Sequence, residues 1–203
     1  MKGLLIKDSY TILKQMKFFL VFIFVFSCIP SFSTLIFAIV YSTMLPMTAI
    51  GYDERSKWDK LAAVMPYSAS DIVLSKYVLG YIMVIATAVI ACIAQAIVGL
   101  FTGTALTIEF FTKLVYIISF ALIIEAIDLP VLIKFGVEKG RLFIILFTVI
   151  TVVGGASLIE NLTNELYLNI NSGAVLALSV SAMLIISAFS AYISVKLYKS
   201  KVE

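Results

Sequence analysis

The sequence predicts an all-α protein, a bundle of six membrane-spanning helices. Of its 203 residues, 62% are hydrophobic, and the mean hydropathy is +1.11. Soluble domains have roughly 45–50% apolar residues, so a soluble fold of this composition would lack enough polar groups to cover its surface. The apolar residues form long runs between short charged loops. Such runs are typical of helical spans and not of the short alternating strands of a membrane β-barrel.

The whole chain, residues 1–203, is treated as one transmembrane domain. A helical span needs about 20 residues. The expected spans are residues 10–29, 32–50, 71–101, 114–133, 142–159 and 174–195. The third run exceeds the required length, so its helix should tilt or project beyond the bilayer.

The first apolar run is the shortest, because only residues 18–29 form a continuous apolar stretch before the expected turn at Pro30 and Ser31. A full span is expected if the helix begins near Tyr10 and Lys14 and Lys17 extend to the membrane interface. The alternative is that this run is a re-entrant or interfacial segment.

The distribution of positive charge predicts the orientation. With six spans, 14 of the 15 Lys and Arg residues fall on the side of the N-terminus, and only Lys113 falls on the other. Positively charged loops mark the cytosolic side of a membrane protein. We therefore expect a multi-pass protein of a bacterial cytoplasmic membrane with both termini in the cytosol. The basic residues are spread over four segments, which does not indicate nucleic-acid binding.

Composition also excludes several kinds of chemistry. The chain has no His, which removes His-based metal sites and general bases. It has no G-x-x-x-x-G-K-[ST] motif, so it lacks the loop that cradles ATP phosphates. Cys28 and Cys92 lie in apolar runs, where we expect them to pack as small hydrophobic residues. We expect no catalytic residues, metal or cofactor in this chain, so its energy must come from a partner or an ion gradient.

A charged island, residues 51–77, interrupts the apolar sequence on the expected cytosolic side. It contains eight charged residues and the only Trp of the chain, Trp58. Ser56 followed by Asp59 matches a helix-capping pattern, which predicts a short helix over residues 56–65. The apolar residues at positions 58, 61, 62 and 65 share one face of that helix.

The end of the island is also patterned. Pro66 should end the short helix, and Ser68 with Asp71 matches a second capping pattern that begins the third span. Two interpretations of the short helix remain open. It lies flat on the inner leaflet with Trp58 at the headgroups, or its apolar face docks in a groove of a soluble partner. The mixed charge of its polar face favours a partner.

The segment DERSKWDKLAAVMPYSASDIVLSKY, residues 53–77, resembles the cytosolic segment after the second span of small six-span ABC-2-type transporter permeases. The later stretch KFGVEKGR, residues 134–141, resembles the inner loop between spans four and five of the same family. Within the family, the resemblance is to exporters of phenol-soluble modulins and related antimicrobial peptides. The very short first hairpin departs from the family pattern.

The resemblance implies an ABC-2 fold of the type V exporter kind, with the short helix as a coupling helix between spans two and three. It implies a separate cytosolic ABC ATPase that binds ATP and Mg²⁺, and a second permease chain in a homodimer or paralogous heterodimer. It implies export of hydrophobic or amphipathic peptides. The expected docking residues are Trp58, Leu61 and Met65, with a polar rim of Asp53, Glu54, Arg55 and Lys57.

Two carboxyl groups lie in the fourth apolar run. Glu125 and Asp128 are three residues apart and so share one face of a helix. Such groups in a bilayer usually face a cavity or a partner, because an ionised carboxylate at its centre costs at least about 2.5–3.5 kcal/mol. Asp128 also fits the cap of a helix that restarts at Pro130. Glu125 fits either a hydrogen bond to a neighbouring helix or a contact with a cationic or amphipathic substrate.

Gln95 is a lone polar residue in the third span, where we expect it to hydrogen-bond a neighbouring helix. Two other function classes stay open besides the exporter subunit. One is a membrane immunity or sensor protein that binds antimicrobial peptides with little transport. The other is an ion-coupled secondary transporter using Glu125 and Asp128, although no matching second half with a broken helix is visible.

Overall fold

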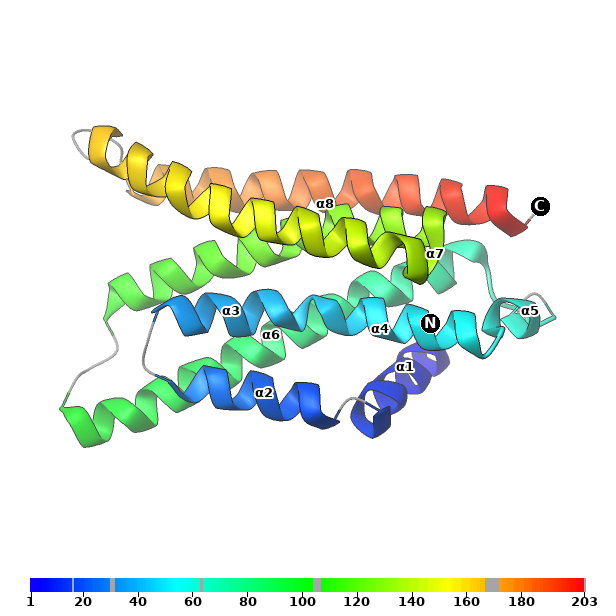
Figure 1. Cartoon of the computed structure of the whole chain (residues 1–203), viewed down its shortest axis with the longest axis horizontal. Helices are drawn as coiled ribbons and strands as arrows, with labels where there is room; N and C mark the ends of the chain where they lie inside the picture. The colour runs from blue at the N-terminus through cyan, green and yellow to red at the C-terminus, as the bar shows by residue number, and fades with distance from the viewer. Residues whose placement is uncertain (16, 30–31, 63, 104–106, 167–171, 203) are drawn as a thin grey trace.

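The computed structural model describes residues 1–15, 17–29, 32–62, 64–103, 107–166 and 172–202, and the regular structure among them is entirely helical. Figure 1 shows the helices in chain order. They are α1 (Lys2–Gln15), α2 (Lys17–Cys28), α3 (Phe32–Ser42), α4 (Met44–Arg55), α5 (Trp58–Ala62), α6 (Ala69–Thr102), α7 (Ile108–Leu166) and α8 (Ser172–Val202). The all-α class expected from the sequence is confirmed for the described residues.

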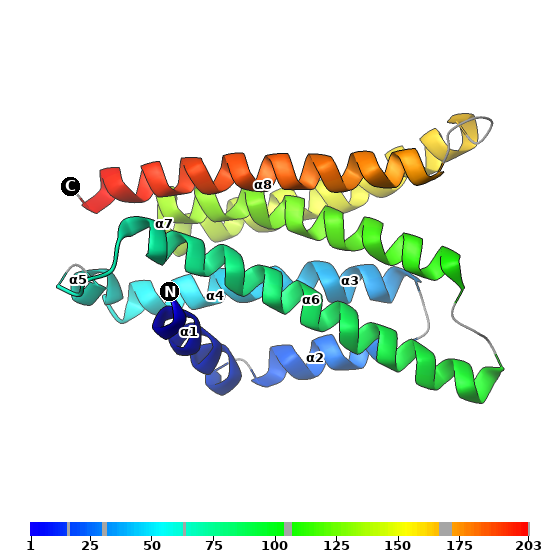
Figure 2. The same cartoon turned by 180° about the vertical axis from the view of Figure 1, so that it is seen from behind.

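The long helices run side by side along one common direction (Figures 1 and 2). The N-terminus, the C-terminus and α5 all lie at the same end of the bundle, and α1 is set at an angle to the other helices there. We call this the α5 end. The last turns of α2 and of α6 lie at the opposite end.

Four described stretches are long and apolar enough to cross a membrane by length and composition: Thr34–Arg55, Ala69–Phe101, Phe110–Leu146 and Leu176–Ser200. The 34 residues of α6 are about 51 Å long at 1.5 Å per residue, well beyond the roughly 30 Å of a hydrocarbon core. The expected long third helix is therefore present. This protein is a multi-pass membrane protein.

Helix α7 reverses direction at Gly136 and so contains two expected spans, 114–133 and 142–159 (Figure 1). The φ of Gly136 is 78° and its ψ is 168°, a conformation that is essentially restricted to glycine. Gly140 then returns past Leu132, where a Cβ on residue 140 would lie 3.2 Å from the Leu132 side chain. The reversal thus needs glycine both for the turn and for the close approach after it.

The expected first span over residues 10–29 is not one helix. Helix α1 ends at Gln15 and α2 begins at Lys17, with the two at an angle to each other (Figure 2). The 12 residues of α2 reach only about 18 Å. The physical reason is that α1 carries Lys2, Lys7, Asp8 and Lys14, which a helix inside the bilayer would have to bury. The expected turn at residues 30–31 lies outside the described residues.

The second expected span, residues 32–50, is formed by α3 and α4, which meet at Thr43. Pro46 causes this break, because its ring nitrogen has no hydrogen to donate to the carbonyl of Ser42 and its ring crowds that carbonyl. Helix α4 continues past residue 50 into the charged island and ends at Arg55.

The short helix of the island is smaller than expected, five residues in place of the ten from 56 to 65. Ser56 does not cap it, because Ser56 closes α4 with its backbone N–H on the carbonyl of Tyr52 at 3.0 Å. The next residue, Lys57, has a positive φ of 54° and turns the chain. The second expected cap is confirmed: the Asp71 backbone N–H donates to Ser68 Oγ at 3.1 Å at the start of α6.

Candidate functional site

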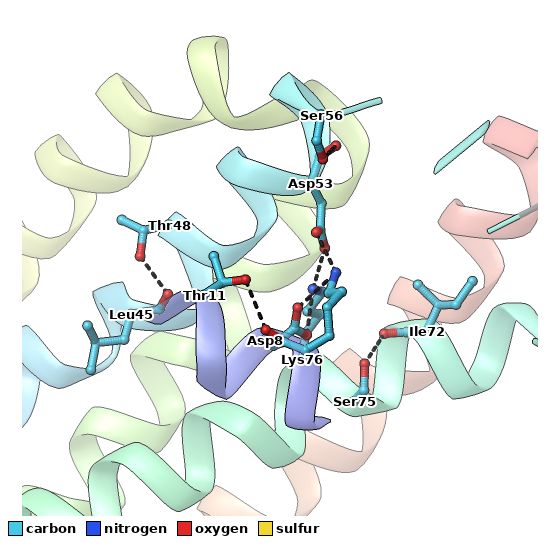
Figure 3. Close-up of polar contacts among 10 residues, drawn as sticks. Asp8, Thr11, Leu45, Thr48, Asp53, Ser56, Ile72, Ser75 and Lys76 are labelled. Atoms are coloured by element: carbon cyan, nitrogen blue, oxygen red, sulfur yellow. Dashed lines mark hydrogen bonds and ion pairs between the residues drawn. The ribbon is translucent and has the colours of Figure 1, made fainter. Parts of the chain in front are cut away.

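Four charged side chains meet at the α5 end: Lys7 and Asp8 from α1, Asp53 from α4 and Lys76 from α6. We call them the charge cluster. Asp53 extends from α4 towards Lys76, and Asp8 approaches from the other side (Figure 3). Three helices that are far apart in the sequence are therefore joined by one set of ion pairs.

The two lysines and two aspartates of the charge cluster alternate and balance. Lys76 Nζ lies 2.7 Å from Asp8 Oδ2 and 2.5 Å from Asp53 Oδ2. Lys7 Nζ lies 2.5 Å from Asp53 Oδ1 and 3.0 Å from Asp8 Oδ1. The side chains of Asp8 and Lys76 are 1% and 8% exposed, so this part of the cluster is shielded from water. Buried charges are tolerated only when they are paired in this way.

A second polar contact ties the end of α4 to the reversal of α7. Glu54 Oε2 accepts a hydrogen bond of 2.9 Å from the backbone N–H of Val137. A Cβ on Gly136 would lie 3.1 Å from Glu54 Oε1. The same carboxylate therefore satisfies a backbone donor that the break at Gly136 leaves free and packs closely on the glycine.

The predicted docking residues are divided between the core and the surface. Trp58 is partly buried against the core cluster that includes Leu4 and Ile50, and Lys7 Nζ lies 4.3 Å from the centre of its ring. A cation at that distance is attracted to the electron-rich face of an indole ring. Trp58 thus anchors α5 to α1 through its buried part, and its role as a docking residue stays a prediction.

Three apolar residues of the island, one in α5 and two in the turn that follows it, are exposed, and we call them the outer face of α5: Leu61, Val64 and Met65. They are 54%, 85% and 40% exposed. The sequence placed Leu61 and Met65 on one face with Trp58, but the helix ends at Ala62, and the turn that follows redirects residues 64 and 65.

The predicted polar rim is divided in the same way. Asp53 and Glu54 face the interior, in the charge cluster and on Val137, whereas Arg55 and Lys57 are exposed. Sequence reasoning missed Asp8 as a partner of the island. A signal was present, since Asp8 lies four residues after Leu4 and four before Ile12, and residues at this spacing share one face of a helix.

The carboxyl group of Glu125 lies deep in the bundle, between α6 and α7. The residue is 1% exposed, and neither carboxyl oxygen has a hydrogen-bond partner among the described residues. A Cβ built on Gly80 of α6 would lie 1.7 Å from Glu125 Oε1. Glycine at position 80 therefore provides the space that the carboxyl group occupies. Asp128, one turn further on, is 9% exposed.

The expected helix break at Asp128 and Pro130 is wrong, because α7 is helical through both residues and its described break is at Gly136. Pro130 has no N–H for the carbonyl of Ala126, but Ser190 of α8 donates its hydroxyl to that carbonyl. Tyr77 of α6 is in turn hydrogen-bonded to Ser190 at 2.6 Å. A neighbouring helix thus supplies the missing donor and the proline does not break α7.

Two smaller expectations concern polar groups. Gln95 Nε2 donates to the carbonyl of Ile29 at 3.2 Å, which confirms the expected hydrogen bond to a neighbouring segment. Within the described part of the chain, no group of three His, Cys, Asp or Glu side chains could hold a metal ion.

A family model described as ABC-2 family transporter protein matches residues 3–199 of the chain. This match covers nearly the full length, including every helix that contributes to the charge cluster. The comparisons with curated proteins and with solved structures found no match.

The first prediction concerns the balance of the charge cluster. Asp8→Asn should lower the free energy of unfolding by about 3–5 kcal/mol, because Lys7 and Lys76 would then share Asp53 alone and one positive charge of the cluster would be uncompensated. Asp8→Asn combined with Lys76→Met should recover much of that loss, since Lys7 and Asp53 remain as one pair. Stability is measured by denaturant titration in detergent micelles. Lys60→Gln, at an exposed position, is the control, and a double variant no more stable than Asp8→Asn would contradict the prediction.

The second prediction concerns the contact of Gly80 with Glu125. Gly80→Ala should destabilise the protein by roughly 1–3 kcal/mol, the usual penalty of overpacking. In a Glu125→Ala background the same substitution should have little effect, because the group that it strikes is gone. A double-mutant cycle of melting temperatures in micelles measures this coupling. Equal effects of Gly80→Ala in both backgrounds would show that the two residues do not compete for space.

Proposed function

Because the chain belongs to the ABC-2 family of transporter proteins, we propose that it is the membrane-spanning permease subunit of an ABC transporter. The family match over residues 3–199 is the observation that carries this proposal. The ATP and Mg²⁺ belong to a separate cytosolic ATPase subunit, and two permease chains, identical or paralogous, form the pathway. The proposed cargo is a hydrophobic or amphipathic peptide, and the direction is export.

The proposed topology has six crossings. They are α2, the joined α3 and α4, α6, the two halves of α7 on either side of Gly136, and α8. Because α2 is only about 18 Å long, its crossing requires Lys14 and Lys17 to extend to the interface and the bilayer to thin locally. This places both termini, α5 and the Gly136 reversal on the cytosolic side. Support comes from their common position at the α5 end (Figure 2) and from the charge distribution, since 14 of 15 basic residues fall on that side. Helix α1 then lies at the cytosolic interface of the membrane.

We propose that α5 is the coupling helix that docks on the ATPase. Its outer face, Leu61, Val64 and Met65, provides exposed apolar side chains on a surface otherwise rich in charge. Exposed basic residues, Arg55 and Lys57, flank this face. A compact apolar centre with a polar rim is the usual anatomy of a protein interface.

The contacts behind α5 support a role in transmitting movement. Trp58 fixes α5 to Lys7 of α1, and Lys7 is bound to Asp53 of α4. Asp53 is bound to Lys76 of α6, and the neighbouring Glu54 holds the reversal of α7 at Val137. A displacement of α5 by an ATPase would therefore act on α1 and on three transmembrane helices, α4, α6 and α7, at once.

Glu125 and Asp128 are the proposed contacts for the cargo. In this conformation Glu125 is enclosed between α6 and α7, so a peptide would reach it only after those helices separate. The support for Glu125 as a cargo contact is chemical. Both of its carboxyl oxygens are without a hydrogen-bond donor among the described residues, and a cationic peptide would supply one.

The third prediction tests the docking surface. Leu61→Ser combined with Met65→Ser should weaken co-purification of the ATPase about tenfold or more, because interface anchors are each worth more than about 1 kcal/mol. The melting temperature of the permease should stay unchanged, since these side chains project from the fold. Leu100→Ser with Phe101→Ser is the control, because both residues are exposed apolar side chains in the last turn of α6, at the opposite end of the bundle.

Trp58→Ala provides a contrast to that double variant. It should lower the melting temperature, because Trp58 packs on the core and on Lys7. If the ATPase co-purifies normally with the Leu61 and Met65 double variant, then α5 is not the docking element.

The fourth prediction concerns the cargo site. Glu125→Gln should reduce the stimulation of ATPase activity by cationic amphipathic peptides severalfold, because the amide cannot pair with a positive charge. The measurement uses the purified permease–ATPase complex and a peptide panel that includes uncharged sequences of equal length. Stimulation that is unchanged for every cationic peptide would assign Glu125 a structural role only.

A further inference from the structure

A groove of about 460 Å³ lies between the end of α4 and the reversal of α7, outside the charge cluster. One wall comes from α4 and the other from the residues around Gly136. Its lining residues are Met47, Thr48, Gly51, Tyr52, Glu54, Arg55, Phe135, Gly136, Val137, Glu138, Lys139 and Arg141. The two walls approach closely at Gly51, where a Cβ would lie 3.3 Å from the Val137 side chain.

The rim of this groove is basic. Arg55, Lys139 and Arg141 line it and are exposed, and none of the three has an ion-pair partner among the described residues. A fourth cation, Lys134, lies with its Nζ 5.2 Å from the ring centre of Phe135 in the groove wall. The lining carboxylates are Glu54, which accepts from the Val137 backbone, and Glu138. Three cations against two carboxylates leave the lining with a net charge of +1.

The other end of the groove is apolar. Met47 precedes Arg55 by eight residues on α4, which places it about 12 Å further from the cytosolic end. Both residues belong to the stretch Thr34–Arg55 that is apolar enough to cross a membrane. Phe135, on the facing wall, is 56% exposed, whereas Met47 is 6% exposed and packs in the core. The exposed apolar surface of the groove therefore comes mainly from Phe135, beside the Gly136 reversal.

We propose that this groove binds an anionic phospholipid of the cytosolic leaflet, with its phosphate at Arg55, Lys139 and Arg141 and the start of an acyl chain against Phe135. The inference rests on the proposed orientation, which puts the α5 end in the cytosol. Basic pockets between transmembrane helices at that surface suit anionic headgroups. One wall of the groove belongs to the apolar stretch Thr34–Arg55, which places the groove at the membrane surface in the proposed orientation.

The bound lipid would sit against the Gly136 reversal and next to Glu54, which connects the groove to the α5 region. The structure therefore assigns the lipid a position from which it stabilises the contact of α4 with α7. The two elements that line the groove, α4 and the α7 reversal, are also the two that the hydrogen bond from Val137 to Glu54 joins.

The test uses the purified full chain in detergent micelles, without any ATPase. Phosphatidylglycerol is titrated against phosphatidylcholine, and binding is followed by native mass spectrometry and by melting temperature. Lys139→Gln with Arg141→Gln should weaken phosphatidylglycerol binding by about 30-fold, which corresponds to about 1 kcal/mol for each basic residue removed. The control is Lys2→Gln with Lys199→Gln, an equal loss of charge at exposed positions of the same end outside the groove.

The expected result is selective binding of phosphatidylglycerol by the wild type and the control, and its loss in the groove variant. Equal losses in both double variants would overturn the proposal, because they would reflect general surface attraction. Inorganic phosphate or glycerol phosphate that displaces the lipid completely would also overturn it, as a site for free phosphate. Normal phosphatidylglycerol binding by the groove variant would overturn it as well. Lipid binding is measured without the ATPase, and docking of α5 is measured by co-purification of the ATPase. The lipid proposal and the docking proposal can therefore fail independently.

Discussion

The structure depends on a balanced set of buried charges at the α5 end. Asp8 and Asp53 each carry an unfavourable desolvation cost that only Lys7 and Lys76 offset, and those partners come from other helices. Helices α1, α4 and α6 must therefore converge before any of these charges is satisfied. This convergence places α1 across the end of the bundle and holds the base of α5 beside it.

Backbone groups that lose their partner within a helix are likewise satisfied by side chains from other helices. Where Pro130 removes a backbone donor, Ser190 supplies one, and where Gly136 interrupts α7, Glu54 accepts from the backbone of Val137. Both replacements come from a different helix. Each irregularity in a transmembrane segment is thus also a tertiary contact, and this explains why one proline leaves α7 helical while one glycine reverses it. Glu125 is the exception, with neither oxygen hydrogen-bonded among the described residues.

These contacts give the α5 end two surfaces with different chemistry. The outer face of α5 is apolar and projects from the bundle, which suits a soluble partner. The groove beside α4 has a basic rim and an exposed aromatic side chain, Phe135, which suits a lipid. Glu54 lies between them and contacts the α7 reversal that forms one wall of the groove. A signal from an ATPase and the lipid environment would therefore act on the same junction of α4 and α7.

The sequence alone determined the class of the protein, because long apolar runs admit few folds other than a helical membrane bundle. It also determined local features whose causes are local, such as the Ser68 cap of α6 and the length of that helix. The tertiary structure decided the direction of each polar side chain. Asp53, Glu54 and Trp58 were expected to face a partner, but partners within the chain, from Lys7 to Val137, hold them inward. Those contacts join residues up to 83 positions apart, a separation that no local pattern encodes.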